Sequence, residues 1–106
     1  SLFIIFGVII MRESKFQANL IDEIRTLLPG CIVFKTDAGY AQGFPDLMIL
    51  YKKRWAALEC KKEANAHHQP NQDYYVDRMN GMSFSSFVYP ENFKEVLDAL
   101  ERSFKA

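Results

Sequence analysis

Three charged residues stand inside apolar runs of this sequence, and their types and spacing could do chemistry. Asp46 opens the apolar run that ends at Tyr51, while Glu59 and Lys61 close the run that begins at Trp55. A charged group in a half-buried strand is costly unless it is paired or holds a metal ion. Glu59 and Lys61 are two residues apart, so on a strand their side chains share a face. The sequence therefore predicts that these charges have partners or a bound metal.

The two apolar runs are predicted to form a β-hairpin around the basic turn Lys52-Lys53-Arg54. Asp46 falls opposite Glu59 if the turn has an even length, such as Lys52-Lys53, or if a bulge absorbs the odd residue. Directly opposed side chains lie roughly 4.5–5.5 Å apart at Cβ, and two carboxylates there repel unless a cation lies between them. All-oxygen coordination suits Mg²⁺ or Mn²⁺. The hairpin therefore predicts a carboxylate metal site with a lysine beside it.

Hydrophobic periodicity and chain breakers give the elements that must position these residues. They predict helices over 11–28, 70–80 and 91–104, with Gly81 ending the second of them. They predict strands over 31–36, in the two halves of 43–61, and over 84–89. The order is helix, three strands, helix, strand, helix. The predicted fold class is therefore mixed α/β (α+β).

Length and composition restrict the class of protein. A chain of 106 residues with 49% hydrophobic residues predicts one folded domain rather than disorder. Thirteen basic and thirteen acidic residues give no net charge, which argues against an indiscriminate polyanion binder but not against a local basic groove. Cys31 and Cys60 are expected to be buried reduced thiols, with a disulfide as the less favoured alternative. Free thiols and the lack of a secretory pattern indicate the cytoplasm, and the small size suggests a bacterial or phage protein.

Residues 1–10 are almost wholly apolar. Ten residues are too few to span a bilayer as a helix, and they lack the features of a signal peptide, so no membrane association is expected. Two interpretations stay open. These residues are an apolar leader foreign to a native domain that starts at Met11, or they form a strand that contacts a second copy in a dimer. In both cases the single domain covers 11–106.

Pro45-Asp46 followed by Glu59-Cys60-Lys61 resembles the signature of the PD-(D/E)XK nuclease superfamily, with Gly43 just before the Pro-Asp pair. Within that superfamily the chain looks most like the small stand-alone VRR-NUC domains, over nearly everything from 11 onward. The resemblance implies a restriction-endonuclease-like αβββαβ core, in which a four-stranded mixed sheet is flanked by helices. The chain departs from the family pattern before this glycine, where family members often carry a basic residue and this chain has a glutamine.

The resemblance implies a role for each matched residue. Asp46 and Glu59 would bind one or two Mg²⁺ ions, with Mn²⁺ able to substitute, and the backbone carbonyl of Cys60 could add a further oxygen. Lys61 would orient the attacking water or stabilise developing negative charge. The remaining matches are the helical glutamate and the glutamine that opens the second helix, Glu13 and Gln72. Glu13 would complete the metal shell directly or through a water, and Gln72 would hold a water or phosphate.

Structural alternatives stay open for several of these residues. Glu13 could be only a surface charge that compensates the dipole of its helix, and Gln72 could be an ordinary polar residue of an exposed turn. Lys61 could be only a salt-bridge partner of the nearby carboxylates. His67-His68 fit a solvated loop better than a zinc site, because adjacent histidines point in different directions.

The resemblance implies an Mg²⁺-dependent endonuclease that hydrolyses phosphodiester bonds in DNA. By analogy it would be selective for DNA structure, acting as a homodimer on branched DNA such as Holliday junctions. The predicted DNA-binding residues are Lys52, Lys53, Arg54 and Lys62. Three alternatives remain: a restriction or flap-type nuclease of the same fold, a non-catalytic nucleic-acid-binding module, and a structural dimerisation protein. The last two leave the charges inside the apolar runs unexplained.

Overall fold

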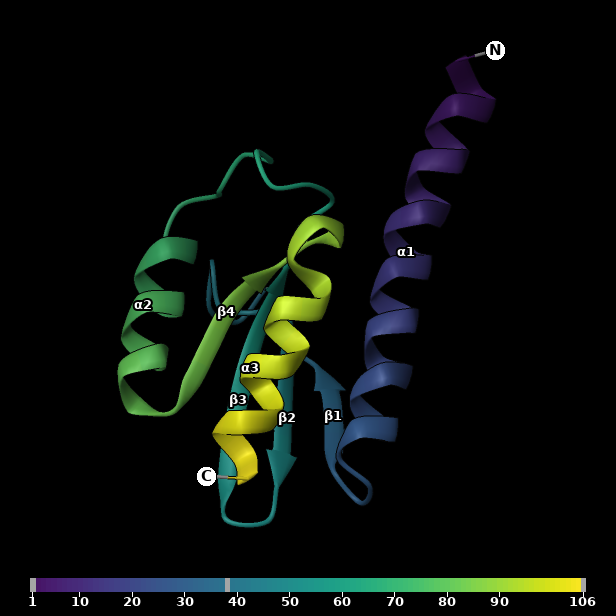
Figure 1. The fold of residues 1–106 in the computed structure, drawn as a ribbon. Coiled ribbons are helices and arrows are strands. Elements are labelled where there is room, and N and C mark those ends of the chain that lie inside the picture. The colour runs from purple at the N-terminus through teal and green to yellow at the C-terminus, as the bar shows by residue number, and fades with distance from the viewer. Residues whose placement is uncertain (1, 38, 106) are drawn as a thin grey trace.

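The structure is a computed structural model that describes the backbone of residues 2–37 and 39–105 and the side chains of residues 14–37 and 39–105. Its order of elements confirms the order predicted from periodicity (Figure 1). The elements are α1 (Leu2–Leu27), β1 (Ile32–Lys35), β2 (Leu47–Tyr51), β3 (Arg54–Cys60), α2 (Gln72–Met82), β4 (Phe84–Val88), the 3₁₀ turn η1 (Pro90–Asn92) and α3 (Phe93–Lys105). The fold is the predicted αβββαβ core with one helix added at its end.

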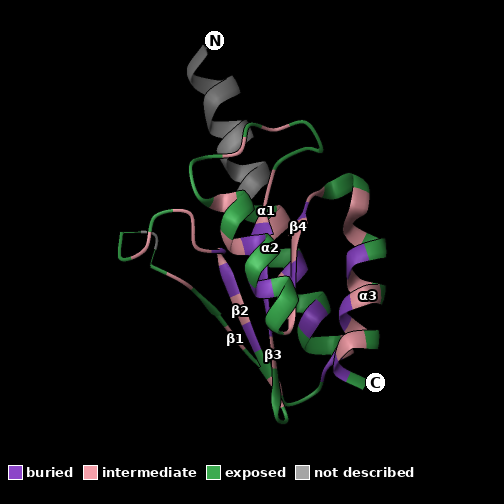
Figure 2. Cartoon of the chain, turned by 90° about the vertical axis from the view of Figure 1, so that its left-hand side faces the viewer, coloured by how far each residue is buried: buried purple, intermediate pink, exposed green. Residues whose placement is uncertain are grey.

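The four strands form one mixed sheet in the order β1-β2-β3-β4. β1, β2 and β3 are antiparallel neighbours, and β4 lies parallel to β3. A parallel neighbour needs a crossover connection, and here the segment that contains α2 provides it. β1 is the outer strand on one side and is largely exposed (Figure 2).

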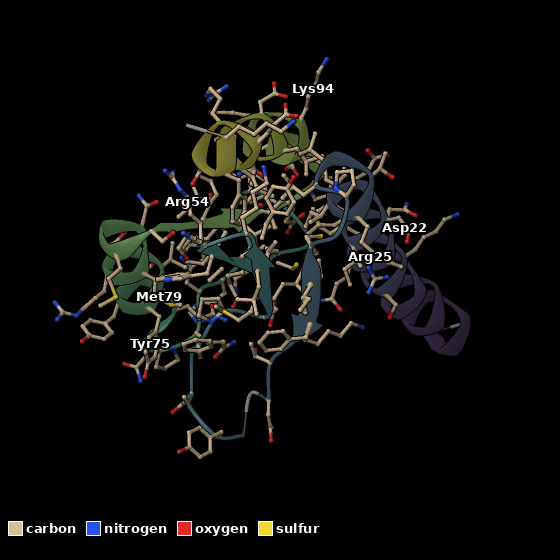
Figure 3. The ribbon with its side chains drawn as sticks, turned by 90° about the horizontal axis from the view of Figure 1, so that it is seen from below. Asp22, Arg25, Arg54, Tyr75, Met79 and Lys94 are labelled. Atoms are coloured by element: carbon tan, nitrogen blue, oxygen red, sulfur yellow. The ribbon has the colours of Figure 1, made fainter. Side chains whose placement is uncertain are left out.

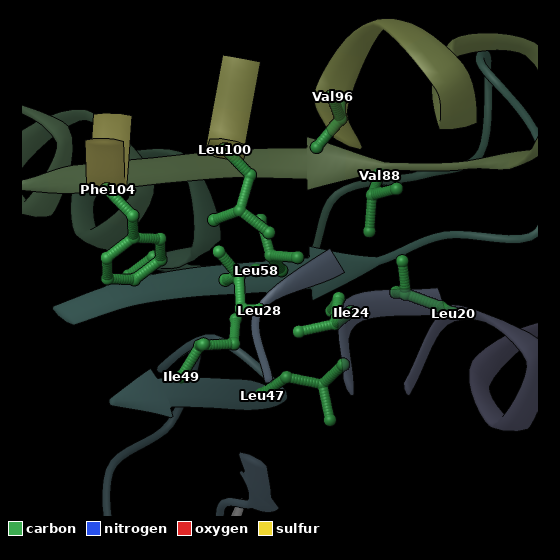
Figure 4. Packing of buried hydrophobic residues seen from close by; sticks show 11 residues of the cluster. Leu20, Ile24, Leu28, Leu47, Ile49, Leu58, Val88, Val96, Leu100 and Phe104 are labelled. Carbon is green, nitrogen blue, oxygen red and sulfur yellow. The ribbon is translucent and has the colours of Figure 1, made fainter. Parts of the chain in front are cut away.

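The main hydrophobic core lies on the face of the sheet that α1 and α3 cover. Figure 4 shows side chains from both helices meeting those of β2, β3 and β4. The cluster consists of Leu20, Ile24, Leu28, Leu47, Ile49, Ala56, Leu58, Val88, Val96, Leu100 and Phe104. Alternate residues of a strand point to opposite faces, so the residues between these face the other side of the sheet. There α2 covers β3 and β4 with Val76 and Met79, which are buried. Within the described residues, no helix therefore covers the second face of β1 and β2.

The N-terminal helix is longer than predicted. α1 starts at Leu2, so the interpretation of the first ten residues as a strand is wrong. The apolar run adds turns to the amphipathic helix that follows it, and a helix satisfies its own backbone hydrogen bonds without a neighbouring strand. The side chains of residues 1–13 lie outside the described part, so the predicted dimer contact there stays a prediction. Within the described residues, no helix is long and apolar enough to cross a membrane.

The prediction that Gly81 ends the second helix is wrong. α2 continues through Gly81 to Met82, and the Ser83 N–H donates to the Met79 carbonyl at 2.9 Å. A glycine ends a helix most effectively when it adopts a positive φ, and among the described glycines only Gly30 and Gly43 do so. The predicted start at residue 70 is also two residues early.

Candidate active site

The hairpin register places the two carboxylates opposite each other. β2 and β3 are joined by the two-residue turn Lys52-Lys53, the even length that this register requires. The prediction of a three-residue turn Lys52-Lys53-Arg54 is wrong, because Arg54 pairs with Tyr51 as the first residue of β3. The register continues one position beyond β2, so Asp46 lies opposite Glu59. The Cys60 N–H donates to Asp46 Oδ2 at 2.9 Å and fixes this carboxylate at the end of the pair. The carboxylates are therefore positioned by strand pairing rather than by a flexible loop.

Glu59 is the most deeply buried charged group of the site, with a relative exposure of 3%. Gln72 Nε2 donates to Oε2 of Glu59 at 3.3 Å, whereas Oε1 is buried with no hydrogen-bond partner among the described residues. Burial, a hydrogen bond to the Asp46 carboxyl and the charge of Asp46 raise the Glu59 pKa to about 8, against the opposing effect of Lys61. Without a cation, the surroundings of Glu59 therefore favour its protonated form.

Lys61 follows Glu59 by two residues, so its side chain lies on the same face, and it contacts the start of α2. Its Nζ donates to Oε1 of Gln72 at 2.6 Å and to the His67 carbonyl at 3.0 Å. Among the described side chains, no carboxylate lies within salt-bridge distance of this ammonium. The interpretation of Lys61 as a salt-bridge partner is therefore not supported. Gln72 bridges the two strand residues, with its amide oxygen towards Lys61 and its amide nitrogen towards Glu59.

A close backbone contact links the loop before Asp46 to the start of α2. Gly43 has φ +86°, and a Cβ there would lie 2.6 Å from the Pro70 carbonyl oxygen and 2.8 Å from atoms of Asn71. Only glycine fits this combination of positive φ and close approach. The contact packs the segment that carries Asp46 against the turn that carries Gln72.

A cavity of about 620 Å³ opens beside the carboxylates. Its wall includes Asp46, Lys61 and Lys62 on one side and Ser14 and Gln17 of α1 on the other. One signal could have identified the two α1 residues, because both lie about one helical turn or less from the predicted glutamate at position 13. The cavity is the place where a substrate can reach Asp46 and Lys61, with Glu59 buried behind its wall.

Cys60 borders the same cavity. Burial and the charge of Asp46 raise the pKa of its thiol to about 12, although a hydrogen bond with Gln17 acts in the opposite direction. The sulfur is therefore a neutral thiol, and a contribution of Cys60 to a metal site would come from its backbone. Cys60 and Cys31 are both free thiols, as predicted, but they are half-buried rather than fully buried.

The predicted DNA-binding residues separate into two places. Lys62 lies at the cavity, whereas Lys52, Lys53 and Arg54 lie at the opposite end of the hairpin. Arg54 Nη1 donates to the Ser103 carbonyl at 2.7 Å, and Figure 3 shows it on the side of α3. The structure therefore does not bring the basic turn to the carboxylates. The sequence prediction grouped the turn with the site because they are close in the sequence, but the length of the seven-residue strand β3 separates them in space.

Glu13 and the histidine pair His67-His68 are the remaining candidates from the sequence. The side chain of Glu13 lies outside the described part, so its predicted metal role stays a prediction. His68 Nδ1 contacts Asp73 Oδ1 at 2.7 Å and its ring stacks on Phe87 at 4.1 Å. His67 contributes a carbonyl rather than its ring to the contacts of Lys61. This arrangement agrees with the interpretation of the histidine pair as part of a loop.

The donor set suits a hard divalent cation. Two opposed carboxylates, one of which has a buried oxygen without a partner, provide the oxygen ligands that Mg²⁺ and Mn²⁺ prefer. Among the described residues, no group of three or more His, Cys, Asp and Glu side chains could hold a metal ion. A cation at Asp46 and Glu59 would therefore need further oxygens from the backbone, from water or from the substrate.

The fold and the opposed carboxylates define a class of protein: the chain has a PD-(D/E)XK nuclease-like fold. Within this class the fold is VRR-NUC-like, as two solved structures show. One, described as a VRR_NUC domain, has 26% identity and a TM-score of 0.64, and the match covers 88% of this chain and 97% of that chain. The other, described as a VRR_NUC domain protein, has 14% identity and a TM-score of 0.63, and the match covers 88% of both chains. No protein-family model matches the chain, and no curated protein matches it in sequence.

Proposed function

We propose that this chain is a metal-dependent DNA endonuclease that hydrolyses phosphodiester bonds. The nuclease-domain fold of the two solved structures supports the class of reaction. The observation that carries the proposal is the pair of Asp46 and buried Glu59, in which two carboxylates lie opposite each other and one buried oxygen of Glu59 has no hydrogen-bond partner among the described residues. A structural protein gains nothing from this arrangement, because burying like charges together is costly. A divalent cation turns the same pair into a stable site.

Asp46 and Glu59 would hold the cation, together with the Cys60 carbonyl oxygen and, in the predicted scheme, Glu13. When bound, Mg²⁺ would supply Lewis-acid polarisation of the phosphate and a more acidic water. The protein fixes where this happens, because Asp46 is held by the Cys60 N–H and Glu59 by Gln72. The ligands are therefore oriented before a cation arrives.

Lys61 would act on the phosphate. In the hydrolysis, a water oxygen bonds to phosphorus, the bond from phosphorus to one ester oxygen breaks, and the products are a phosphate monoester end and a hydroxyl end. Negative charge increases on the phosphate oxygens during attack, and a compact ammonium beside them is stabilising. Gln72 and the His67 carbonyl hold the Lys61 ammonium at the edge of the cavity, and Lys62 adds a second cation there.

The substrate we propose is DNA with branched structure, such as a Holliday junction, cut by a homodimer. A domain of 106 residues has little surface for reading a base sequence, so recognition by shape is favoured over a base code. A homodimer provides two active sites, as cutting both strands of a symmetric junction requires. The overall charge of zero agrees with recognition at a local site rather than by general attraction to DNA.

The test is cleavage of linear, flapped and four-way-junction DNA with Mg²⁺, Mn²⁺ or EDTA. Wild-type protein is compared with Asp46→Ala and Lys61→Ala, and with Lys94→Ala on the exposed side of α3 as a matched control. We expect cutting that needs the metal, is lost at least a hundredfold in the first two variants, and is unchanged in the control. Binding that is indifferent to metal, with no cutting on any substrate, would instead identify a non-catalytic binding module.

A further inference from the structure

A second cavity, of about 410 Å³, lies at the end of β1 and under the loop that leads to Asp46. Three aromatic rings contribute to its wall: Phe34 of β1 and Tyr40 and Phe44 of the loop. We call these three residues and the space between them the aromatic pocket. The pocket belongs to the face of β1 and β2 that no helix covers, since α2 packs on β3 and β4.

The aromatic pocket is open to solvent. Tyr40 has a relative exposure of 93% and Phe34 one of 46%. Phe44 also contacts Tyr75 of α2 edge to face, with 5.4 Å between the ring centroids, and Tyr75 contacts Tyr74 in the same way. Tyr75 lies on the side of the sheet away from α3 (Figure 3). Aromatic rings therefore extend from the pocket to α2 along one surface.

Short connections join this surface to the candidate active site. Phe44 precedes Asp46 by two residues, and Tyr75 follows Gln72 by three, which is one helical turn. The Thr36 N–H donates to the Asp46 carbonyl at 2.8 Å, so the loop that carries the pocket begins and ends next to this carboxylate. Thr36 Oγ1 also donates to the Pro45 carbonyl at 2.7 Å. The pocket and Asp46 therefore lie on one continuous segment whose two ends are hydrogen-bonded to each other.

We infer that the aromatic pocket binds an unpaired nucleobase of the DNA strand that is cut. The inference rests on the proposed function, which places the scissile phosphate at Asp46 and Glu59. Aromatic rings stack on any base, and a base is an apolar face with a polar edge. Asp37 also lines the pocket, and its carboxylate disfavours a phosphate there, so the base rather than the backbone enters. Lys35, on the same wall, supplies a cation for an adjoining phosphate.

This occupant restricts the substrate. A base in a continuous duplex is stacked and paired, and taking it out costs a few kcal/mol. A base at a branch point, flap or gap is already unpaired, so the pocket favours cutting beside such a position. Selectivity for DNA structure would then come from the state of one nucleotide, without any reading of its sequence.

The experiment measures binding in EDTA, so that its outcome does not depend on cleavage. The probes are a fluorescein-labelled oligo-dT strand and an abasic strand of the same length, titrated with wild type, Tyr40→Ala, Tyr40→Phe and Phe34→Ala. Met82→Ala is the control, since Met82 is also an exposed apolar side chain and lies at the C-terminal end of α2. We expect Tyr40→Ala to weaken oligo-dT binding roughly 5- to 100-fold and to leave abasic binding unchanged. Tyr40→Phe and Met82→Ala should bind as wild type does.

Equal losses on both strands in Tyr40→Ala, or no loss in both Tyr40→Ala and Phe34→Ala, would overturn the inference. So would conversion of a dimer to a monomer by Tyr40→Ala, measured by sedimentation velocity, with the ratio of oligo-dT to abasic affinity unchanged. That result would assign the pocket to contact with a second copy. A different result would contradict the proposed function alone: the protein would still prefer the oligo-dT strand to the abasic strand, but it would show no metal-dependent cutting. If Asp46→Ala abolishes cutting but the protein does not discriminate between the oligo-dT and abasic strands, the proposed function holds and the inference that the pocket binds a base is wrong.

Discussion

The replacement of Glu59 by glutamine should stabilise the metal-free protein at high pH and have little effect at low pH. Glutamine keeps the shape of the side chain and an oxygen that can accept from Gln72, but it carries no charge. In the wild type, ionised Glu59 faces burial and the neighbouring Asp46 charge, which together raise its pKa. The variant removes this cost without creating a cavity.

The sign and size follow from the displaced pKa. The pKa of Glu59 is raised from 4.5 to about 8 in the folded protein. Below about pH 4.5 both the folded and the unfolded states carry the proton, so there is no cost. Between these values the folded state holds a proton that the unfolded state has lost, and the free energy of unfolding falls as pH rises. At about 1.36 kcal/mol for each pH unit, the complete loss is on the order of 4 to 5 kcal/mol above pH 8.

The assay is urea unfolding at about pH 4 and about pH 8.5, in EDTA, for wild type, Glu59→Gln and Glu23→Gln. Glu23 is exposed on α1 and serves as the matched control. We expect wild type and Glu59→Gln to agree at the low pH and to differ by several kcal/mol at the high pH, with Glu23→Gln following the wild type. A wild-type stability that does not fall relative to Glu59→Gln as pH rises would refute the described carboxylate pair.

Two further substitutions test how the site and the helices are held. Gly43→Ala should lower the free energy of unfolding by more than Gly30→Ala does. Both glycines have a positive φ, which costs about 1 to 2 kcal/mol for a residue with a Cβ, but only a Cβ at Gly43 would also clash with Pro70. Denaturant unfolding measures both losses, and equal losses would contradict the close contact. Arg54→Ala should lower the thermal midpoint through loss of about 1 kcal/mol from its hydrogen bond to the last turn of α3, with no comparable change in Lys53→Ala; equal midpoints for the two variants would exclude that role.

Much of the fold and of the site geometry could be predicted because both depend on local rules. Breakers and periodicity separated the elements, and the two-residue turn fixed the pairing of Asp46 with Glu59. Strand alternation then placed Lys61 on the face of Glu59, where one amide contacts both residues. Gln72 was matched through the family resemblance rather than through any local pattern.

The parts that could not be predicted depend on contacts between distant segments. No local pattern shows that the Arg54 guanidinium reaches the end of α3. Gly81 has the residue type of a helix stop, but the backbone there stays helical, and the Ser83 N–H still donates to the Met79 carbonyl. The aromatic pocket could not be predicted because Phe34, Tyr40 and Phe44 follow no common periodicity in the sequence. They come together only when the loop folds over the end of β1.

The placement of Gln72 explains how one site can keep a lysine and two carboxylates without neutralising itself. An ammonium needs acceptors and a carboxylate needs donors, and a direct bond between Lys61 and Glu59 would satisfy both. It would also cancel the negative charge that attracts a cation. The glutamine amide gives each partner the group it needs, with its oxygen towards Lys61 and its nitrogen towards Glu59. The carboxylate pair therefore stays available for a divalent ion, while Lys61 lies at the cavity where the phosphate would bind.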